Sequence, residues 1–121
     1  MKFVLVTKEK EIILAAEKAY GTHYQLKVHD HWGPALEDAS DADLMFVDLI
    51  ATLTEPGKIK GYEDFAEAKM SHEKSCGTPL VVFAPPADYE LDSMVGYPNF
   101  LFAMVRRPIT DRFFRQASGW V

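Results

Sequence analysis

The chain has 121 residues, a formal net charge of −5, and hydrophobic residues at 48% of its positions. This length and composition predict one domain with a single core that needs no disulfide or structural metal. The acidic balance argues against a general nucleic-acid or membrane-surface binder, because both classes usually need a basic patch. Cys76 is the single cysteine, which excludes an intrachain disulfide and is typical of a cytoplasmic protein. We expect no signal peptide and no membrane span, since no apolar run approaches roughly 20 residues.

Apolar runs predict five short β-strands along the chain. They lie at 2–6, 24–28, 44–49, 80–84 and 100–105. Most of these runs are almost uninterrupted, which favours strands covered on both faces. The run at 24–28 alternates between apolar and polar residues, which places it nearer a sheet edge.

Helical patterns follow the predicted strands in turn. They lie at 8–20, 34–39, 62–74, 87–95 and 110–118. Thr110 is the expected N-cap of the last helix, because its hydroxyl can accept a hydrogen bond from a backbone N–H in the first turn. The segment 50–61 holds one proline and two glycines and is expected to be a loop.

The alternation of strands and helices predicts an α/β fold with a parallel sheet, right-handed crossovers and helices on both faces. Five strands of this length fit a flavodoxin-like, doubly wound sheet with strand order 2-1-3-4-5. In such a sheet the functional site lies past the carboxyl ends of the central strands. Asp48, at the end of the third predicted strand, is therefore the leading candidate for a functional side chain.

Four short motifs, in this order and spacing, resemble the receiver domain of two-component response regulators. They are Gly33 with Ala35-Leu36, ADLMFVDL at 42–49, PLVVFA at 79–84, and Arg107-Pro108-Ile109. The resemblance covers essentially the whole chain and implies one CheY-like receiver domain over residues 1–121. It also implies that Asp48 occupies the position of the aspartate that accepts a phosphoryl group.

Other positions depart from the receiver pattern. Two acidic residues normally follow the first strand and help hold a divalent cation, which prefers carboxylate oxygens. Here those positions hold Thr7 and Lys8, and Glu9 comes one position late. Ala84 stands where a hydroxyl residue normally ends the fourth strand, and Arg107 stands where a lysine is usual. Arginine keeps the positive charge but not the compact shape of an ammonium group.

These departures predict a degenerate receiver, or pseudo-receiver, with a vestigial phosphoacceptor site at Asp48, Lys8, Ala84 and Arg107. Lys8 and Arg107 are expected to flank Asp48 and to replace the missing metal, so no metal or other cofactor is expected. The predicted role is non-enzymatic, cytoplasmic signalling through a protein partner. The alternatives are a receiver that is phosphorylated at Asp48 and a small α/β enzyme that processes a nucleotide or nucleoside.

A C-terminal surface is the predicted contact site for that partner or for a second copy of the chain. Receivers usually meet partners through their fourth helix, fifth strand and fifth helix, here 87–95, 100–105 and 110–118. The residues expected on this surface are Arg106, Arg112, Phe113 and Arg115. An exposed aromatic ring beside arginines suits a protein interface.

Several other residues have competing interpretations. His29 and His31 could bind a metal, but a solvated strand end is favoured because no third ligand is evident. Cys76 is favoured as a plain small residue over a nucleophile, and His72 is expected mid-helix on the surface. The helix at 62–74 also resembles, faintly, the nucleoside deoxyribosyltransferases, in which case Glu63 or Glu67 would be catalytic. The chain is also compatible with one domain of a longer signalling protein.

Overall fold

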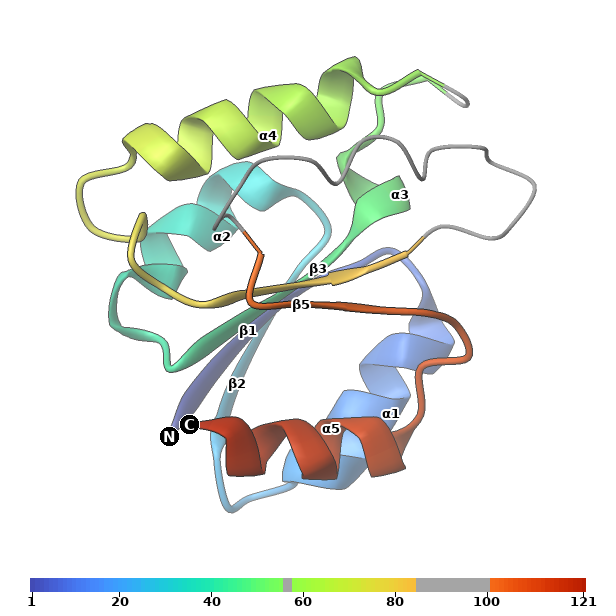
Figure 1. Ribbon diagram of the computed structural model, residues 1–121. Helices are drawn as coiled ribbons and strands as arrows, with labels where there is room; N and C mark the ends of the chain where they lie inside the picture. Colours follow the sequence, from blue (N-terminus) through green and yellow to red (C-terminus); the bar gives the residue numbers. More distant parts are fainter. Residues whose placement is uncertain (56–57, 85–100) are drawn as a thin grey trace.

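The computed structural model describes residues 1–55, 58–84 and 101–121 and contains one parallel sheet (Figure 1). Its strands are β1 (Lys2–Val6), β2 (Gln25–His29), β3 (Leu44–Asp48), β4 (Leu80–Phe83) and β5 (Ala103–Val105). The strand order is β2-β1-β3-β4-β5, and each neighbouring pair is parallel. The predicted α/β fold, the strand order and the edge position of the second strand are therefore confirmed.

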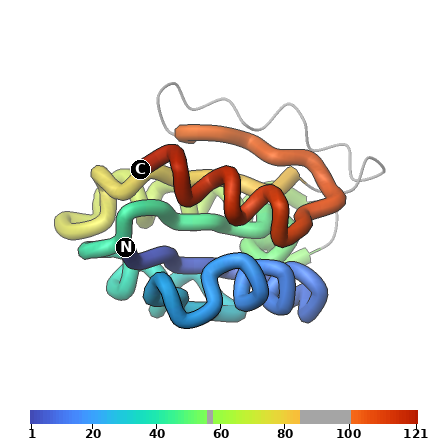
Figure 2. The backbone as a smooth tube through the Cα atoms, turned by 90° about the horizontal axis from the view of Figure 1, so that it is seen from below, coloured from blue at the N-terminus to red at the C-terminus, as the bar shows by residue number. Residues whose placement is uncertain are grey.

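Helices cover both faces of the sheet. They are α1 (Lys10–Tyr20), α2 (Trp32–Asp38), α3 (Leu49–Thr52), α4 (Lys60–Ser71) and α5 (Asp111–Ala117), with 3-10 turns η1 (Ala39–Asp41) and η4 (Ser118–Trp120). Helices α1 and α5 pack on one face, and α2 and α4 pack on the other (Figures 1 and 2). The loop expected at 50–61 is wrong at its start, where α3 continues directly from β3. The helix expected at 87–95 lies outside the described residues.

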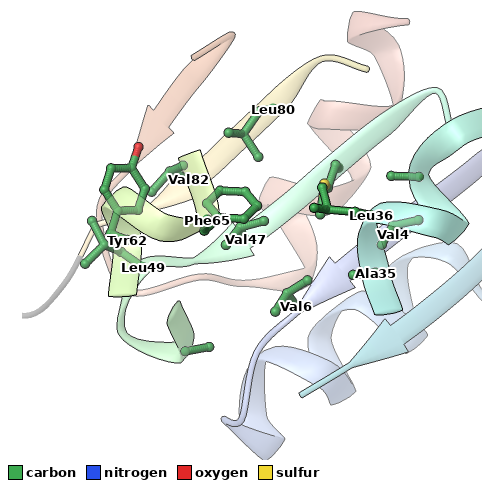
Figure 3. Close-up of a cluster of buried hydrophobic side chains, with 13 residues drawn as sticks. Val4, Val6, Ala35, Leu36, Val47, Leu49, Tyr62, Phe65, Leu80 and Val82 are labelled. Atoms are coloured by element: carbon green, nitrogen blue, oxygen red, sulfur yellow. The ribbon is translucent and has the colours of Figure 1, made fainter. Parts of the chain in front are cut away.

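Alternation along the strands divides the core into two layers. In β1, Val4 and Val6 face α2 and α4, whereas Phe3 and Leu5 face α1 and α5. This follows from the pleat of a strand, which points successive side chains to opposite faces. Figure 3 shows the side chains of the first layer, which include the rings of Tyr62 and Phe65. Because both faces are covered, the central strands read in the sequence as continuous apolar runs.

An aromatic cluster fills the second layer. The Tyr20 ring stacks on Phe3 with centroids 4.4 Å apart, and it meets Phe114 edge-on at 5.7 Å. The Tyr20 hydroxyl is buried and has no hydrogen-bond partner among the described residues. Burial raises the pKa of this phenol because the charged form is poorly solvated there.

Tyr20→Phe is expected to raise the free energy of unfolding by about 1 kcal/mol at pH 7, because it removes an unsatisfied buried hydroxyl without a change of ring. The raised pKa adds a pH dependence. Above the usual pKa of 10.0, the unfolded chain loses this proton and the folded chain keeps it, so stability falls as pH rises. The variant should lack that loss. Urea unfolding at pH 7, 10 and 11 measures both effects, and a variant less stable than the wild type at pH 7 would contradict them.

Two features fix α4 against its surroundings. The Lys69 side chain is buried, and its Nζ donates to the carbonyl oxygens of Ser75 at 3.1 Å and Thr78 at 2.7 Å. Burial lowers the pKa of this ammonium. At the other end of α4, Gly61 packs so tightly that an added Cβ would lie 2.1 Å from the carbonyl oxygen of Thr52. The start of α4 therefore needs glycine to rest against α3.

No helix in the described part of the chain has the length and hydropathy needed to cross a membrane.

Candidate functional site

Asp48 lies where the carboxyl ends of three strands meet. It is the last residue of β3, and its side chain is only 1% exposed. Thr7 directly follows β1 and is also buried. Arg107 follows β5, and its side chain is 18% exposed. Parallel strands end at the same edge of a sheet, which brings these distant segments together.

Arg107 neutralises Asp48 through one nitrogen of its guanidinium group. The Nη2 atom donates to Asp48 Oδ1 at 2.8 Å and to Oδ2 at 2.9 Å, and it reaches Glu9 Oε1 at 3.1 Å. Nη2 is thus surrounded by three carboxylate oxygens from two acidic residues. The predicted pairing of Arg107 with Asp48 is therefore present.

The other two guanidinium nitrogens of Arg107 differ from Nη2. Nε and Nη1 of Arg107 are buried, and neither has a hydrogen-bond acceptor among the described residues. The pair is therefore not the usual fork, in which two nitrogens each donate to one carboxylate oxygen. Buried donors without acceptors cost stability, so the contact with the two carboxylates must offset that cost.

Thr7 completes the surroundings of Asp48, a role that the sequence reading missed. Its hydroxyl donates to Asp48 Oδ2 at 2.9 Å and accepts from the backbone N–H of Glu9 at 3.1 Å. Glu9 is the N-cap residue of α1. A threonine directly after a buried strand was the available signal, because a hydroxyl at a strand end can serve a neighbouring carboxylate.

Lys8 does not flank Asp48, so this part of the prediction is wrong. It is exposed and forms no ion pair with any described residue. Thr7 continues the ladder beyond β1, since its N–H donates to the carbonyl oxygen of His29 at 3.0 Å. The Thr7 hydroxyl contacts Asp48, whereas the chain bends at Lys8 and leaves that side chain exposed.

Ala84 directly follows β4 and is buried. Its N–H donates to the carbonyl oxygen of Val105 at 2.8 Å, which extends the β4–β5 ladder by one residue. Its methyl group offers no donor to a phosphoryl group. The residue next to Asp48 along the sheet edge thus adds no polar chemistry to the site.

The site does not fit the divalent cation that the receiver resemblance implies. A hard cation needs several oxygen ligands, and no group of three or more potential ligands occurs within residues 1–55, 58–84 and 101–121. Asp48 and Glu9 supply carboxylates, but the Arg107 guanidinium lies between them.

The residues of the predicted C-terminal surface differ in exposure and in their ion pairs. Arg106 and Arg112 are exposed, without an ion pair in the described segments, and Phe113 is half-buried. Arg115 is exposed but pairs with Asp111 at 2.9 Å. The predicted N-cap is confirmed, since the Thr110 hydroxyl accepts from the backbone N–H of Phe113.

Two exposed aromatic rings extend this surface. Phe102 is 54% exposed and Trp120 is 40% exposed, and their ring centroids lie 5.8 Å apart. Trp120 also meets Phe113 at 5.7 Å. The sequence reading expected one exposed aromatic ring here and named neither Phe102 nor Trp120 as that ring. Phe102 directly precedes the edge strand β5 and Trp120 ends the terminal 3-10 turn, and both side chains are exposed there.

The histidines serve local structure. His29 Nε2 contacts Asp38 Oδ2 at 2.6 Å, and His31 Nδ1 accepts from the N–H of Gly33 at 2.9 Å as the N-cap of α2. Each imidazole therefore has its own partner, and the two do not bind one shared metal ion. His72 is not mid-helix on the surface as expected: it caps the C-terminus of α4, and its side chain is largely covered.

Cys76 is exposed and unpaired, which leaves its predicted role as a plain small residue untested. Glu63 and Glu67, the residues expected to matter in a nucleoside-processing enzyme, both lie on α4. Neither forms a hydrogen bond or ion pair with Asp48 or Arg107. The described geometry thus brings no second carboxylate from α4 into the Asp48 site.

Comparison with solved structures identifies the fold. No protein-family model matches the chain, and no curated protein matches it. A response regulator from Hahella chejuensis is 17% identical with a TM-score of 0.69, over 99% of this chain and 94% of that one. The chemotaxis response regulator CheY4 of Vibrio cholerae is 14% identical with a TM-score of 0.66, over 98% and 96%. A response regulator protein from Burkholderia multivorans is 12% identical with a TM-score of 0.65, over 98% and 92%. The chain therefore has the fold of the CheY-like response regulator receiver domains.

Proposed function

We propose that residues 1–121 form a single pseudo-receiver domain, which signals in the cytoplasm through protein–protein contact. It is not an enzyme, and it does not depend on metal-assisted phosphorylation of Asp48. One observation carries this proposal: the Arg107 Nη2 atom lies within 3.1 Å of carboxylate oxygens from both Asp48 and Glu9. An internal cation thus occupies the surroundings that a receiver would offer to a metal ion.

The chemistry of phosphoryl transfer explains why this arrangement argues against a phosphoacceptor. The attacking oxygen must approach the phosphorus in line with the leaving group, and cations must stabilise the charge on the transferred group. Both Asp48 oxygens already accept hydrogen bonds, from Arg107 and Thr7, and the side chain is 1% exposed. Attack would require breaking these contacts. Ala84 supplies no hydroxyl to help.

The C-terminal surface supports a protein partner. Exposed rings at Phe102 and Trp120 lie near half-buried Phe113 on α5. Arg106 and Arg112 are exposed, and both are free of ion pairs with described residues. Aromatic residues and arginine are enriched at protein interfaces and supply many of the residues that dominate binding. This surface suits a signalling partner or a second copy of the chain.

Incubation with Mg²⁺ and acetyl phosphate is expected to leave the intact mass of the protein unchanged. Beryllofluoride with Mg²⁺ should likewise cause no stoichiometric change in tryptophan fluorescence. A phosphorylatable receiver treated in parallel provides the positive control. A Mg²⁺-dependent mass increase of one phosphoryl group, abolished by Asp48→Asn, would overturn the proposal and establish the alternative of a phosphorylatable receiver.

A further inference from the structure

A crevice of about 310 Å³ lies at the carboxyl ends of β1 and β3. The residues that matter in its lining are Lys8, His31, Trp32, Thr52, Thr54 and Asp64. We call it the β1–β3 crevice. Neither Asp48 nor Arg107 lines it, so it is separate from the ion pair described above. The inference drawn from it does not depend on the proposed signalling function.

The position of the crevice is that of a ligand site. From β1 the chain passes to α1 on one face of the sheet, and from β3 it passes towards α4 on the other face. The connections therefore diverge between β1 and β3, which are neighbours in the sheet. Open α/β sheets bind ligands outside the carboxyl ends of their strands at such a point.

The charged groups of the crevice favour an anion. Lys8 is exposed, and its ammonium pairs with no carboxylate in the described ranges. Asp64 is the acidic residue of the lining, and its Oδ1 already accepts from Lys60 Nζ at 3.2 Å. Within the described residues, the positive charge of Lys8 is therefore not neutralised by a carboxylate of the chain itself.

Polar and aromatic groups complete the lining. The Thr54 hydroxyl is exposed and makes no hydrogen bond with a described residue. The Thr52 hydroxyl donates to the carbonyl oxygen of Leu49 at 2.6 Å and keeps only its accepting capacity. Trp32 is half-buried and stacks on His31 with centroids 5.1 Å apart. A flat ring system next to one free cation suits a flat ligand with one negative group.

We infer that the β1–β3 crevice binds a small aromatic anion of mononucleotide size, with its charged group on Lys8 and its ring against Trp32. A phosphate or a carboxylate can supply the negative charge. The volume is at the lower end of the range for small-molecule pockets, about 300–1,000 Å³, which favours a ligand of this size.

Fluorescence of Trp32 tests the inference directly. The chain has two tryptophans, and Trp120→Phe leaves Trp32 as the single reporter. The probes are the nucleoside monophosphates, benzoate as an aromatic carboxylate, uncharged adenosine and inorganic phosphate, each titrated at 0.15 M salt. We expect saturable quenching by at least one of the two aromatic anion classes, and the class that binds identifies the charged group. Adenosine and phosphate alone should bind at least tenfold more weakly.

Lys8→Met should weaken binding of the best probe at least tenfold by calorimetry. Lys10→Met is the matched control, because Lys10 is an exposed lysine two residues away that does not line the crevice, and it should leave the affinity unchanged. The inference is overturned if no aromatic anion binds saturably. It is also overturned if phosphate alone binds as tightly as the aromatic anions, or if Lys8→Met and Lys10→Met behave alike.

Discussion

Arg107→Met is expected to lower the free energy of unfolding by about 3–5 kcal/mol, the range for removal of one partner from a buried ion pair. The variant leaves the Asp48 carboxylate buried, with the Thr7 hydroxyl as its remaining side-chain donor. Methionine fills much of the volume of the arginine stem, so the loss reports the charge rather than a cavity. Urea unfolding followed by circular dichroism at pH 7 measures it.

A double-mutant cycle separates the pair from its surroundings. Asp48→Asn combined with Arg107→Met should be more stable than Arg107→Met alone by about 2 kcal/mol, because no buried charge is left without a partner. Arg106→Met is the matched control for the loss of an arginine. Arg106 is exposed and has no ion pair with a described residue, so the change should stay within about 0.5 kcal/mol. Equal losses for both arginine variants would contradict the buried-pair explanation.

Gly61→Ala is expected to lower the free energy of unfolding by about 2 kcal/mol. The added Cβ would lie 2.1 Å from the carbonyl oxygen of Thr52 and 3.0 Å from Leu53 Cα, so α4 must move away from α3. Overpacking of this kind costs about 1–3 kcal/mol, occasionally more. Alanine is more favourable than glycine in a helix by about 1 kcal/mol. A net loss of stability would therefore come from the steric clash.

Gly119→Ala is the matched control, since a Cβ at Gly119 meets no atom within 4 Å. Its stability should be unchanged or slightly higher. Thermal and urea unfolding of both variants measure the difference. If Gly61→Ala were as stable as Gly119→Ala, then the close approach of α4 to α3 would not hold in solution.

The strands were predictable because their burial on both faces leaves an uninterrupted apolar signature. Helices α1 and α4 carry the complementary amphipathic pattern, and Gly21 ends α1 with a positive φ of 49°. Helix α3 was missed for an equally physical reason. It has four residues and no side-chain cap, and packing by α4 supports it rather than any local preference.

The part of the candidate site that depends only on strand topology was predictable from the sequence. Asp48 ends β3 and Arg107 follows β5 at the same edge of the sheet, so the parallel arrangement brings them close. Lys8 was not predictable from its position after the first strand, because the chain bends there and the buried Thr7 contacts Asp48 instead. The β1–β3 crevice could not be predicted, since its walls come from the segments after three strands and from the close approach at Gly61.

The ion pair between Asp48 and Arg107 joins residues 59 positions apart, and the contact with Glu9 spans 98. A ribosome-bound chain that has not yet exposed residue 107 holds the third strand with its terminal carboxylate but lacks the cation that permits its burial. Contacts of such long separation form late, because loop closure must precede them. We therefore expect fragments that end just before Arg107 to stay unfolded even though all five strands are present.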